Sequence, residues 1–307
     1  MGFDKADIYK GKYSDDPRMG NLVTSSMEDA DYVIQGYPDD EGIDNNNGRM
    51  GASQGPNGIR QIFYKTTPHQ VLETPGIYDA GNLILDDKLS NRHEIAKAQA
   101  KSILSKDKVL IGLGGGHDYA YPDGASFIED SAAENTKPLI INFDAHLDLR
   151  PVTDRINSGT PFYRLLSEYP NQFDFIQIGL QQVCNSKNHF EWGKERGMQS
   201  VWLEDYKASG ENLSSYFVRR FENIFTKKPP TYLSIDIDVF SSSVAPGASQ
   251  SWPYGLMPED FFPLFLLLIE RLPVKLLGIY EVSPPLDENL KTQRLAEQII
   301  HRFIYRY

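Results

Sequence analysis

Two short motifs place acidic and imidazole side chains at alternate positions of the chain. Asp144, His146 and Asp148 are spaced i, i+2, i+4, and Asp236 and Asp238 repeat the i, i+2 spacing. On an extended chain this spacing puts the side chains of each motif on one face. Carboxylates that directly follow an apolar strand are costly to bury unless a cation or hydrogen-bond donors compensate them. A metal ion is the simplest compensation, although a single Asp after a strand commonly caps a helix instead.

A third candidate is His117, which follows a glycine-rich turn after the apolar run 109–113. The segment 112–117 falls short of the GxGxxG dinucleotide-binding pattern, because His stands where the last glycine is required. We expect the glycines to let the backbone turn tightly, so that His117 reaches the same metal site. A lone His after a strand is more often structural, but a shared sheet edge with the two acidic motifs favours a ligand role.

These ligand types favour manganese. Carboxylate and imidazole together suit Mn²⁺ better than Mg²⁺, which avoids imidazole, or Zn²⁺, which usually takes fewer ligands, while iron and cobalt stay open. Because the four carboxylates carry four negative charges, two divalent ions would balance them. Two such ions could hold a bridging hydroxide as a nucleophile at neutral pH. A single ion with spare carboxylates is the alternative.

The elements that must position these residues are short apolar runs separated by helix-like segments. The predicted strands are 32–36, 109–113, 139–143, 175–179, 201–203, 232–236 and 276–280, and the clearest helical segments are 91–105, 213–225 and 258–272. Apolar strands that alternate with helices indicate an α/β fold with a parallel sheet covered on both faces. In such a sheet the carboxyl ends of the strands meet at one edge, where ligands bind. The motifs should converge there.

Glu281 follows the last of these runs at the same edge. As a loop carboxylate it could face water, and as an anion in the site it could hold a cationic amidine or guanidine group. The sequence leaves both interpretations open.

Composition excludes several other classes of protein. The 307 residues include 31 Lys and Arg against 42 Asp and Glu, a formal charge of −11, which argues against general binding of nucleic acid. One cysteine, Cys184, allows no intramolecular disulfide and suits a reducing compartment, so we expect a cytoplasmic protein. No signal peptide is expected, because residues 1–7 contain no apolar stretch, and no membrane-spanning helix is expected, because the longest apolar stretch, 261–269, is too short. We predict a single domain over 1–307, with 1–30 as a peripheral segment.

Taken together, the motifs around His117, Asp144 to Asp148 and Asp236 to Asp238 resemble the ureohydrolase superfamily of arginases, agmatinases and formimidoylglutamases. The resemblance extends from about Tyr32 to about Pro285. It implies a three-layer αβα domain with an eight-stranded, mostly parallel sheet and a binuclear manganese centre.

The resemblance also implies roles for individual residues. One ion would be held by His117, Asp144, Asp148 and Asp236, and the other by Asp144, His146, Asp236 and Asp238. Asp144 and Asp236 would bridge the two ions. Asp148 would also bind the bridging hydroxide and pass its proton to the leaving amine, while Glu281 would orient the amidine.

Within the superfamily the chain is most similar to formimidoylglutamases. Three stretches carry this similarity: 40–56, the Leu149-Arg150-Pro151 that closes the first acidic motif, and 244–247 after the second. Arginases and agmatinases carry a His after a Ser-Gly pair that is thought to shuttle protons. This chain reads Ser158-Gly159-Thr160-Pro161-Phe162 there, and the next His is His189. The remaining histidines, 69, 93, 189 and 301, lie outside any metal spacing, and we expect them at the surface or in the core.

N-formimidoyl-L-glutamate carries two carboxylates, so an acidic protein that binds it needs fixed guanidinium groups. Arg150, two residues after a predicted ligand, is the first candidate, and Arg49 in the Asn-rich loop is the second. Each could instead make a structural contact. Ser158, Gly159 and Thr160 are candidates for further hydrogen-bond donors to the substrate.

The sequence therefore predicts a manganese-dependent hydrolase that converts N-formimidoyl-L-glutamate and water to L-glutamate and formamide in histidine degradation. A guanidino hydrolase of the agmatinase or guanidinobutyrase type, which releases urea, is one alternative. A non-catalytic, metal-binding regulatory protein of the same fold is another. The expected partner is a small-molecule amidine, with no nucleic acid or membrane, and formation of a homo-oligomer is possible.

Overall fold

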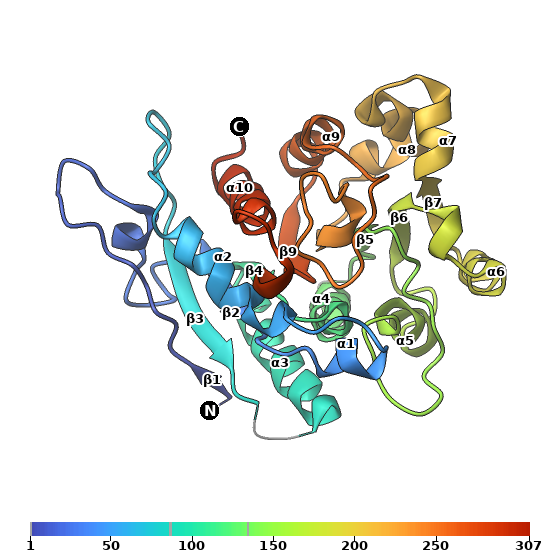
Figure 1. The fold of residues 1–307 in the computed structure, drawn as a ribbon, viewed down its shortest axis with the longest axis horizontal. Helices are drawn as coiled ribbons and strands as arrows, with labels where there is room; N and C mark the ends of the chain where they lie inside the picture. Colours follow the sequence, from blue (N-terminus) through green and yellow to red (C-terminus); the bar gives the residue numbers. More distant parts are fainter. Residues whose placement is uncertain (1, 86–87, 134) are drawn as a thin grey trace.

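The computed structural model describes residues 2–85, 88–133 and 135–307, and one twisted sheet runs through the molecule (Figure 1). Within these residues the sheet has nine strands in the order β1-β3-β2-β4-β9-β8-β5-β6-β7. The strands are β1 (Phe3–Asp4), β2 (Tyr32–Gly36), β3 (Ile77–Leu83), β4 (Val109–Leu113), β5 (Leu139–Phe143), β6 (Asp174–Leu180), β7 (Gln199–Trp202), β8 (Thr231–Asp236) and β9 (Val274–Tyr280).

Eight of the strands pair in parallel, and the two-residue β1 pairs antiparallel with β3 at one edge. The α/β class and the mostly parallel sheet are therefore confirmed, and the expected count of eight differs from the observed nine by the short edge strand. All seven strands expected from apolar runs are present. β3 was not among them, because Asp79 and Asn82 interrupt its apolar pattern and Gly81 adopts a positive φ of 88°.

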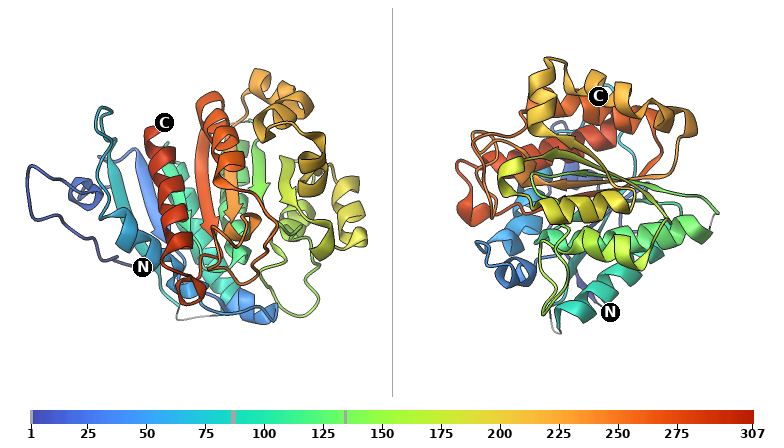
Figure 2. Two further views of the ribbon diagram at one scale, coloured as in Figure 1. Left: turned by 45° about the horizontal axis from the view of Figure 1, so that its top comes forward. Right: turned by 90° about the vertical axis from the view of Figure 1, so that its right-hand side faces the viewer.

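Helices cover both faces of the sheet (Figure 2). α2, α8, α9 and α10 pack with one apolar cluster on one face, and α3, α4 and α5 pack with a second on the other. The helices are α1 (Glu41–Asn45), α2 (Gly55–Phe63), α3 (Leu89–Leu104), α4 (Ala120–Ala133), α5 (Pro161–Glu168), α6 (Lys187–Glu195), α7 (Leu203–Ser209), α8 (Leu213–Lys227), α9 (Pro258–Arg271) and α10 (Lys291–Tyr305). The three helical segments expected from the sequence correspond to α3, α8 and α9 within two residues at each end.

The central strands are buried along their whole length. Every residue of β5 and β8 is buried, and so are the last four residues of β4. Continuous burial is expected for parallel strands covered on both faces. Among the helices of the described residues, none is long and apolar enough to cross a lipid bilayer.

Candidate metal centre

Four neighbouring strands bring the predicted ligands to one edge of the sheet. β4, β9, β8 and β5 are adjacent, and each is followed directly by a segment with chemistry-bearing side chains. His117 begins a 3₁₀ turn after β4, Asp144 follows β5, Asp236 ends β8, and Glu281 follows β9. The expected convergence of the motifs at the carboxyl edge is observed.

The glycines before His117 are required by the close approach of other parts of the chain. A Cβ on Gly115 would lie 1.7 Å from the carbonyl oxygen of Asp39, which no side chain tolerates. The Gly114 N–H donates to the Ile279 carbonyl at 2.7 Å, and the His117 N–H donates to Glu281 Oε1 at 3.1 Å. The turn is thereby held against β9 and its following loop.

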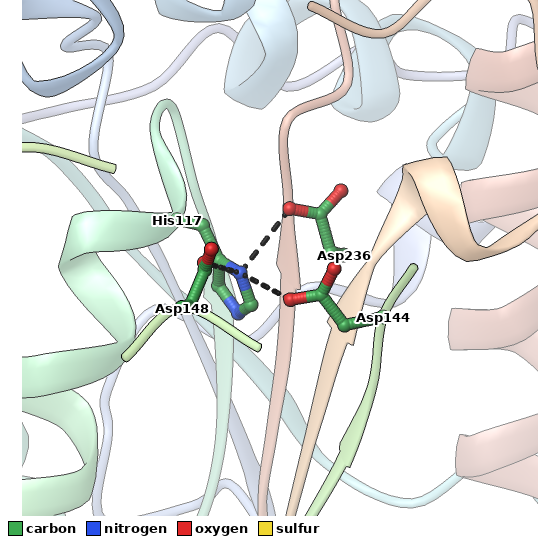
Figure 3. Close-up of side chains that lie close together, drawn as sticks. All are labelled: His117, Asp144, Asp148 and Asp236. Carbon is green, nitrogen blue, oxygen red and sulfur yellow. Dashed lines mark ion pairs between the residues drawn. The ribbon is translucent and has the colours of Figure 1, made fainter. Parts of the chain in front are cut away.

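His117 faces three carboxylates (Figure 3). Its Nδ1 lies 3.1 Å from Asp144 Oδ2, 2.8 Å from Asp148 Oδ2 and 3.2 Å from Asp236 Oδ2. On the other side of the ring, Nε2 is 3.0 Å from the Ser234 hydroxyl. When Nε2–H donates to Ser234, the Nδ1 lone pair points at three carboxylate oxygens, an arrangement that is repulsive without a cation. These four residues therefore form one group that could hold a metal ion.

A second group lies beside the first and shares Asp144 with it. It consists of Asp144, His146 and Asp238, with His146 Nδ1 at 2.9 Å from Asp238 Oδ2 and 3.6 Å from Asp144 Oδ1. The two oxygens of Asp144 thus face different groups, as expected of a bridging ligand. Asp236 was expected to bridge as well, but the structure groups it with the first set only, and its Oδ1 accepts the Asp238 N–H at 2.9 Å. Its bridging role stays a prediction.

The carboxylates of the cluster carry more negative charge than the protein's hydrogen-bond donors around them can compensate. Asp144, Asp236, Asp238 and Glu281 are all at least 96% buried. Burial, reinforced by the neighbouring carboxylates, raises the pKa of Asp236 and of Glu281 well above the usual values. Burial and Asp144 likewise raise the pKa of Asp148 to about 6. A divalent cation would reverse these shifts, because it stabilises the ionised carboxylates.

The pKa values of the two imidazoles are raised as well, but by contact with carboxylates and against the effect of burial. Burial opposes protonation of His117, yet its contacts with Asp144, Asp148 and Asp236 raise its pKa well above the usual value. The pKa of His146 is raised in the same way, with Asp238 as the main favourable partner. Without a metal ion, the protein can balance the negative charge of this site only by binding extra protons. The donor set, two imidazoles and four carboxylates, is the type that Mn²⁺ accepts, so the residues fit the expected ions.

A cavity of about 590 Å³ opens onto the cluster. Glu281 lies in its wall rather than at the surface, so the water-facing alternative is excluded, and Oε2 has no hydrogen-bond partner among the described residues. Glu281 has a positive φ of 64°, a backbone conformation uncommon for a side chain other than glycine. Such conformations are often kept where they direct a side chain into a functional site.

Of the predicted substrate contacts, Arg150 and Ser158 line the cavity. Arg150 Nη1 donates to Asn46 Oδ1 at 2.8 Å, and Asn46 Nδ2 donates to the Ser158 hydroxyl at 3.0 Å. Gly159 and Thr160 do not line the cavity. The Gly159 carbonyl accepts the Arg150 N–H at 2.8 Å, and the buried Thr160 hydroxyl donates to the Asn157 carbonyl, so both shape the loop.

Arg49 also lies outside the cavity wall. Its Nε donates to the Ser249 carbonyl at 2.9 Å and its Nη2 to the Ala248 carbonyl at 3.0 Å. These bonds join two loops about 200 residues apart in the sequence. The geometry gives Arg49 a structural contact, and its predicted contact with substrate gains no support.

Asn46 and His189 are among the residues of the cavity wall that sequence reasoning missed. Asn46 lies in the Asn-rich loop after α1, in which only Arg49 was predicted to contact the substrate. His189 was expected at the surface or in the core, but it lies on α6 in the wall of the cavity. No local spacing could have revealed it, because α6 approaches the site through tertiary contacts.

Comparisons with known proteins agree with this geometry. The profile of the arginase family matches residues 30–305. Formimidoylglutamase of Staphylococcus aureus strain JH9 is 30% identical over 289 residues, which cover 93% of this chain and 89% of that protein. A solved structure of Trypanosoma cruzi formiminoglutamase with Mn²⁺ is 28% identical, with a TM-score of 0.82 over 95% of this chain and 98% of that one. A formimidoylglutamase from Bacillus subtilis, 24% identical, shares the fold with a TM-score of 0.85 over 97% of this chain and 94% of that one. The chain belongs to the arginase family.

Proposed function

We propose that this protein is a manganese-dependent hydrolase that converts N-formimidoyl-L-glutamate and water to L-glutamate and formamide. The observation that carries the proposal is the buried, undercompensated cluster of carboxylates and imidazoles at the floor of a cavity that also contains Arg150. Relatives named formimidoylglutamase over most of the chain, and the Mn²⁺ in the Trypanosoma cruzi structure, support the choice of metal and substrate.

Two groups of side chains would hold the metal. The first is His117, Asp144, Asp148 and Asp236, and the second is Asp144, His146 and Asp238. Divalent ions bound there supply a nucleophile from water at neutral pH and stabilise negative charge in the transition state. The remaining steps depend on side chains of this chain.

Asp148 is suited to transfer the proton. It lines the cavity, and its side chain is 11% exposed, whereas Asp144 in the same group is fully buried. A carboxyl at the boundary between cluster and cavity can take a proton from the attacking water and give it to the departing α-amine of glutamate.

Glu281 is suited to hold the formimidoyl group. One of its oxygens accepts the His117 N–H, and the other has no protein partner and lies in the cavity wall. That free oxygen can accept an N–H of the amidinium and fix the orientation of its carbon.

Arg150 provides the positive charge that an anionic substrate needs. Its guanidinium is held by the amide of Asn46, and no carboxylate of the described residues forms a salt bridge with it. A salt bridge to a nearby Asp was the alternative to substrate binding. The guanidinium therefore remains available to a carboxylate of the substrate.

Assays of the manganese-loaded protein test this proposal. We expect formamide and L-glutamate from N-formimidoyl-L-glutamate, and no urea from agmatine or guanidinobutyrate. We expect R150A to raise KM by about 10- to 100-fold, the value of one or two charged hydrogen bonds. R155A, in the same loop but outside the cavity wall, is the matched control and should keep the wild-type KM. Urea without glutamate would identify a guanidino hydrolase, and full metal occupancy without turnover of any amidine would favour the regulatory alternative.

A further inference from the structure

His189 is the imidazole of the cavity wall that belongs to neither metal group. It lies in the first turn of α6, where Ser186 is the N-cap residue, and it is half-buried. Asn185 and Ser186 line the cavity beside it. The start of α6 therefore forms one wall of the cavity.

This wall is joined directly to the metal cluster. The Asn185 side chain donates to the carbonyl oxygens of Ala145 at 2.8 Å and Gln181 at 2.7 Å. Its Oδ1 accepts the Leu147 N–H at 2.7 Å. Ala145 and Leu147 alternate with the ligands Asp144, His146 and Asp148, so one amide fixes the beginning of α6 against the ligand segment. His189, one turn further, has a defined place relative to the reacting centre.

The charges of the cavity divide it into two parts. The carboxylates in its wall, Asp148, Asp236, Asp238 and Glu281, lie with His117 and His146 at the metal cluster. In the described part of the remaining wall, Arg150 carries a positive charge, and His189 is a side chain that can become positively charged. The amino-terminal end of α6 adds a partial positive charge. A dicarboxylate can avoid the negative groups only by placing its carboxylates along this second part.

Arg150 and His189 lie close enough to influence each other. Partial burial, followed by the positive charge of Arg150, lowers the pKa of His189. The imidazole is therefore neutral near pH 7 in the free protein, and it can still donate one N–H to an anion.

We propose that His189 binds the side-chain carboxylate of the substrate, while Arg150, two residues after the ligand Asp148, binds the carboxylate beside the reacting nitrogen. This inference rests on the proposed function. It defines the substrate class as linear amidines that carry two carboxylates. It also predicts that a cationic tail such as that of agmatine is disfavoured, since Arg150 and the amino-terminal end of α6 would repel it.

The test compares two substrates that differ only in the charge of the side-chain group: N-formimidoyl-L-glutamate and N-formimidoyl-L-glutamine. We expect H189A to raise KM for the glutamate compound about 10-fold, with kcat within about twofold, since one hydrogen bond to a charged group is lost. On the glutamine compound the same variant should change KM by less than about threefold. H189Q, which keeps an N–H donor, should lie between wild type and H189A. E191Q, on the same helix and exposed, is the control and should match the wild type.

Three results would overturn the inference. They are an unchanged KM in H189A, an equal loss on both substrates, and a loss of kcat that free imidazole restores, which would indicate proton transfer instead of binding. Thermal unfolding shows whether each variant folds, and if H189A does not, H189Q on the two substrates decides the question. Failure of the proposed function is distinguishable, because the wild-type protein itself would then release no formamide and glutamate.

Discussion

Two of the buried groups of charged side chains among the described residues differ in whether their charges balance. The first, the Arg60 cluster, joins Arg60 on α2 to Tyr64, Asp79 and Asn82. Arg60 donates to Asp79 through Nε at 2.8 Å and Nη2 at 2.9 Å, and to Asn82 Oδ1 at 2.6 Å. The Tyr64 hydroxyl donates to the same carboxylate. One cation meets one carboxylate, and the guanidinium and the carboxylate each have several partners.

The metal cluster is also largely buried, but its charge balance is the opposite. Its carboxylates outnumber its imidazoles, Glu281 Oε2 has no partner, and His117 Nδ1 faces three carboxylate oxygens. Burial by itself therefore does not indicate function. A closed set of partners indicates a structural role, whereas an excess of one charge around a cavity indicates where a ligand belongs.

The largest effect should come from removing one carboxylate of the metal cluster. D236N should lower manganese content and reduce turnover by more than about 100-fold, the upper range for residues that only support a metal ligand. Without metal its free energy of unfolding should equal or exceed that of the wild type, because one buried, uncompensated carboxylate is gone. Metal analysis and urea denaturation in chelator measure both. A metal-free variant several kcal/mol less stable than the wild type would contradict the comparison.

Substitutions in the Arg60 cluster should instead lower the stability of the protein and leave manganese binding unchanged. R60A leaves Asp79 buried without its cation and should lower the free energy of unfolding by about 3–5 kcal/mol. Manganese content and turnover per folded molecule should stay unchanged. The double variant R60M/D79L, which removes both charges, should recover much of the lost stability. Loss of manganese in R60A at full folding would show that the two clusters are coupled.

A smaller effect is expected from the serine behind His117. S234A removes the hydroxyl at His117 Nε2 and should weaken manganese binding by about 10- to 100-fold, with only a small change in metal-free stability. S126A is the control, because this buried serine bonds the Asp123 carbonyl and contacts no ligand. Calorimetric titration with Mn²⁺ compares them. Equal affinities in S234A and the wild type would mean that Ser234 does not orient the imidazole.

The last effect is the pH dependence of a buried carboxylate that belongs to neither cluster. Burial raises the pKa of Asp123 to about 7, although the hydroxyls of Tyr280 and Tyr37 donate to it. The folded state therefore binds this proton more tightly than the unfolded state. The resulting stability is complete below about pH 4 and is lost as pH rises through 7, by at most about 1.4 kcal/mol per pH unit. D123N should lack this contribution, which denaturation of both proteins at pH 5, 6 and 7 measures. If the free energies of unfolding of D123N and the wild type change with pH in parallel, Asp123 is already ionised over this range.

Local patterns were sufficient to predict the centre of the fold and the side chains that the structure brings together at its carboxyl edge. An apolar run such as 139–143 followed at once by Asp144, His146 and Asp148 places a strand and its ligands without any long-range information. The same holds for 232–236 with Asp236 and Asp238. Adjacent, buried strands then bring such segments together because parallel strands share an edge.

What the sequence could not predict depends on contacts between distant segments. β3 was missed because Asp79 and Asn82 become compatible with a buried strand only through Arg60 on α2. Arg49 and Arg150 look equivalent in the sequence, but the former is bonded to Ala248 and Ser249, while the latter lines the cavity. The position of His189 in the cavity wall depends on the contacts that Asn185 makes at the beginning of α6. The predicted single domain, the location in the cell and the formation of a homo-oligomer stay predictions.

The central claim is that the unbalanced cluster is completed by two manganese ions that make the protein an amidine hydrolase. The most direct measurement is turnover of N-formimidoyl-L-glutamate by the chelator-treated protein during titration with Mn²⁺, with bound metal measured at each point. We predict no turnover without metal, and formamide and L-glutamate released in equal amounts once metal is bound, reaching a maximum at two ions per chain. Hydrolysis by the metal-free protein, or saturation with manganese without hydrolysis, would contradict the account.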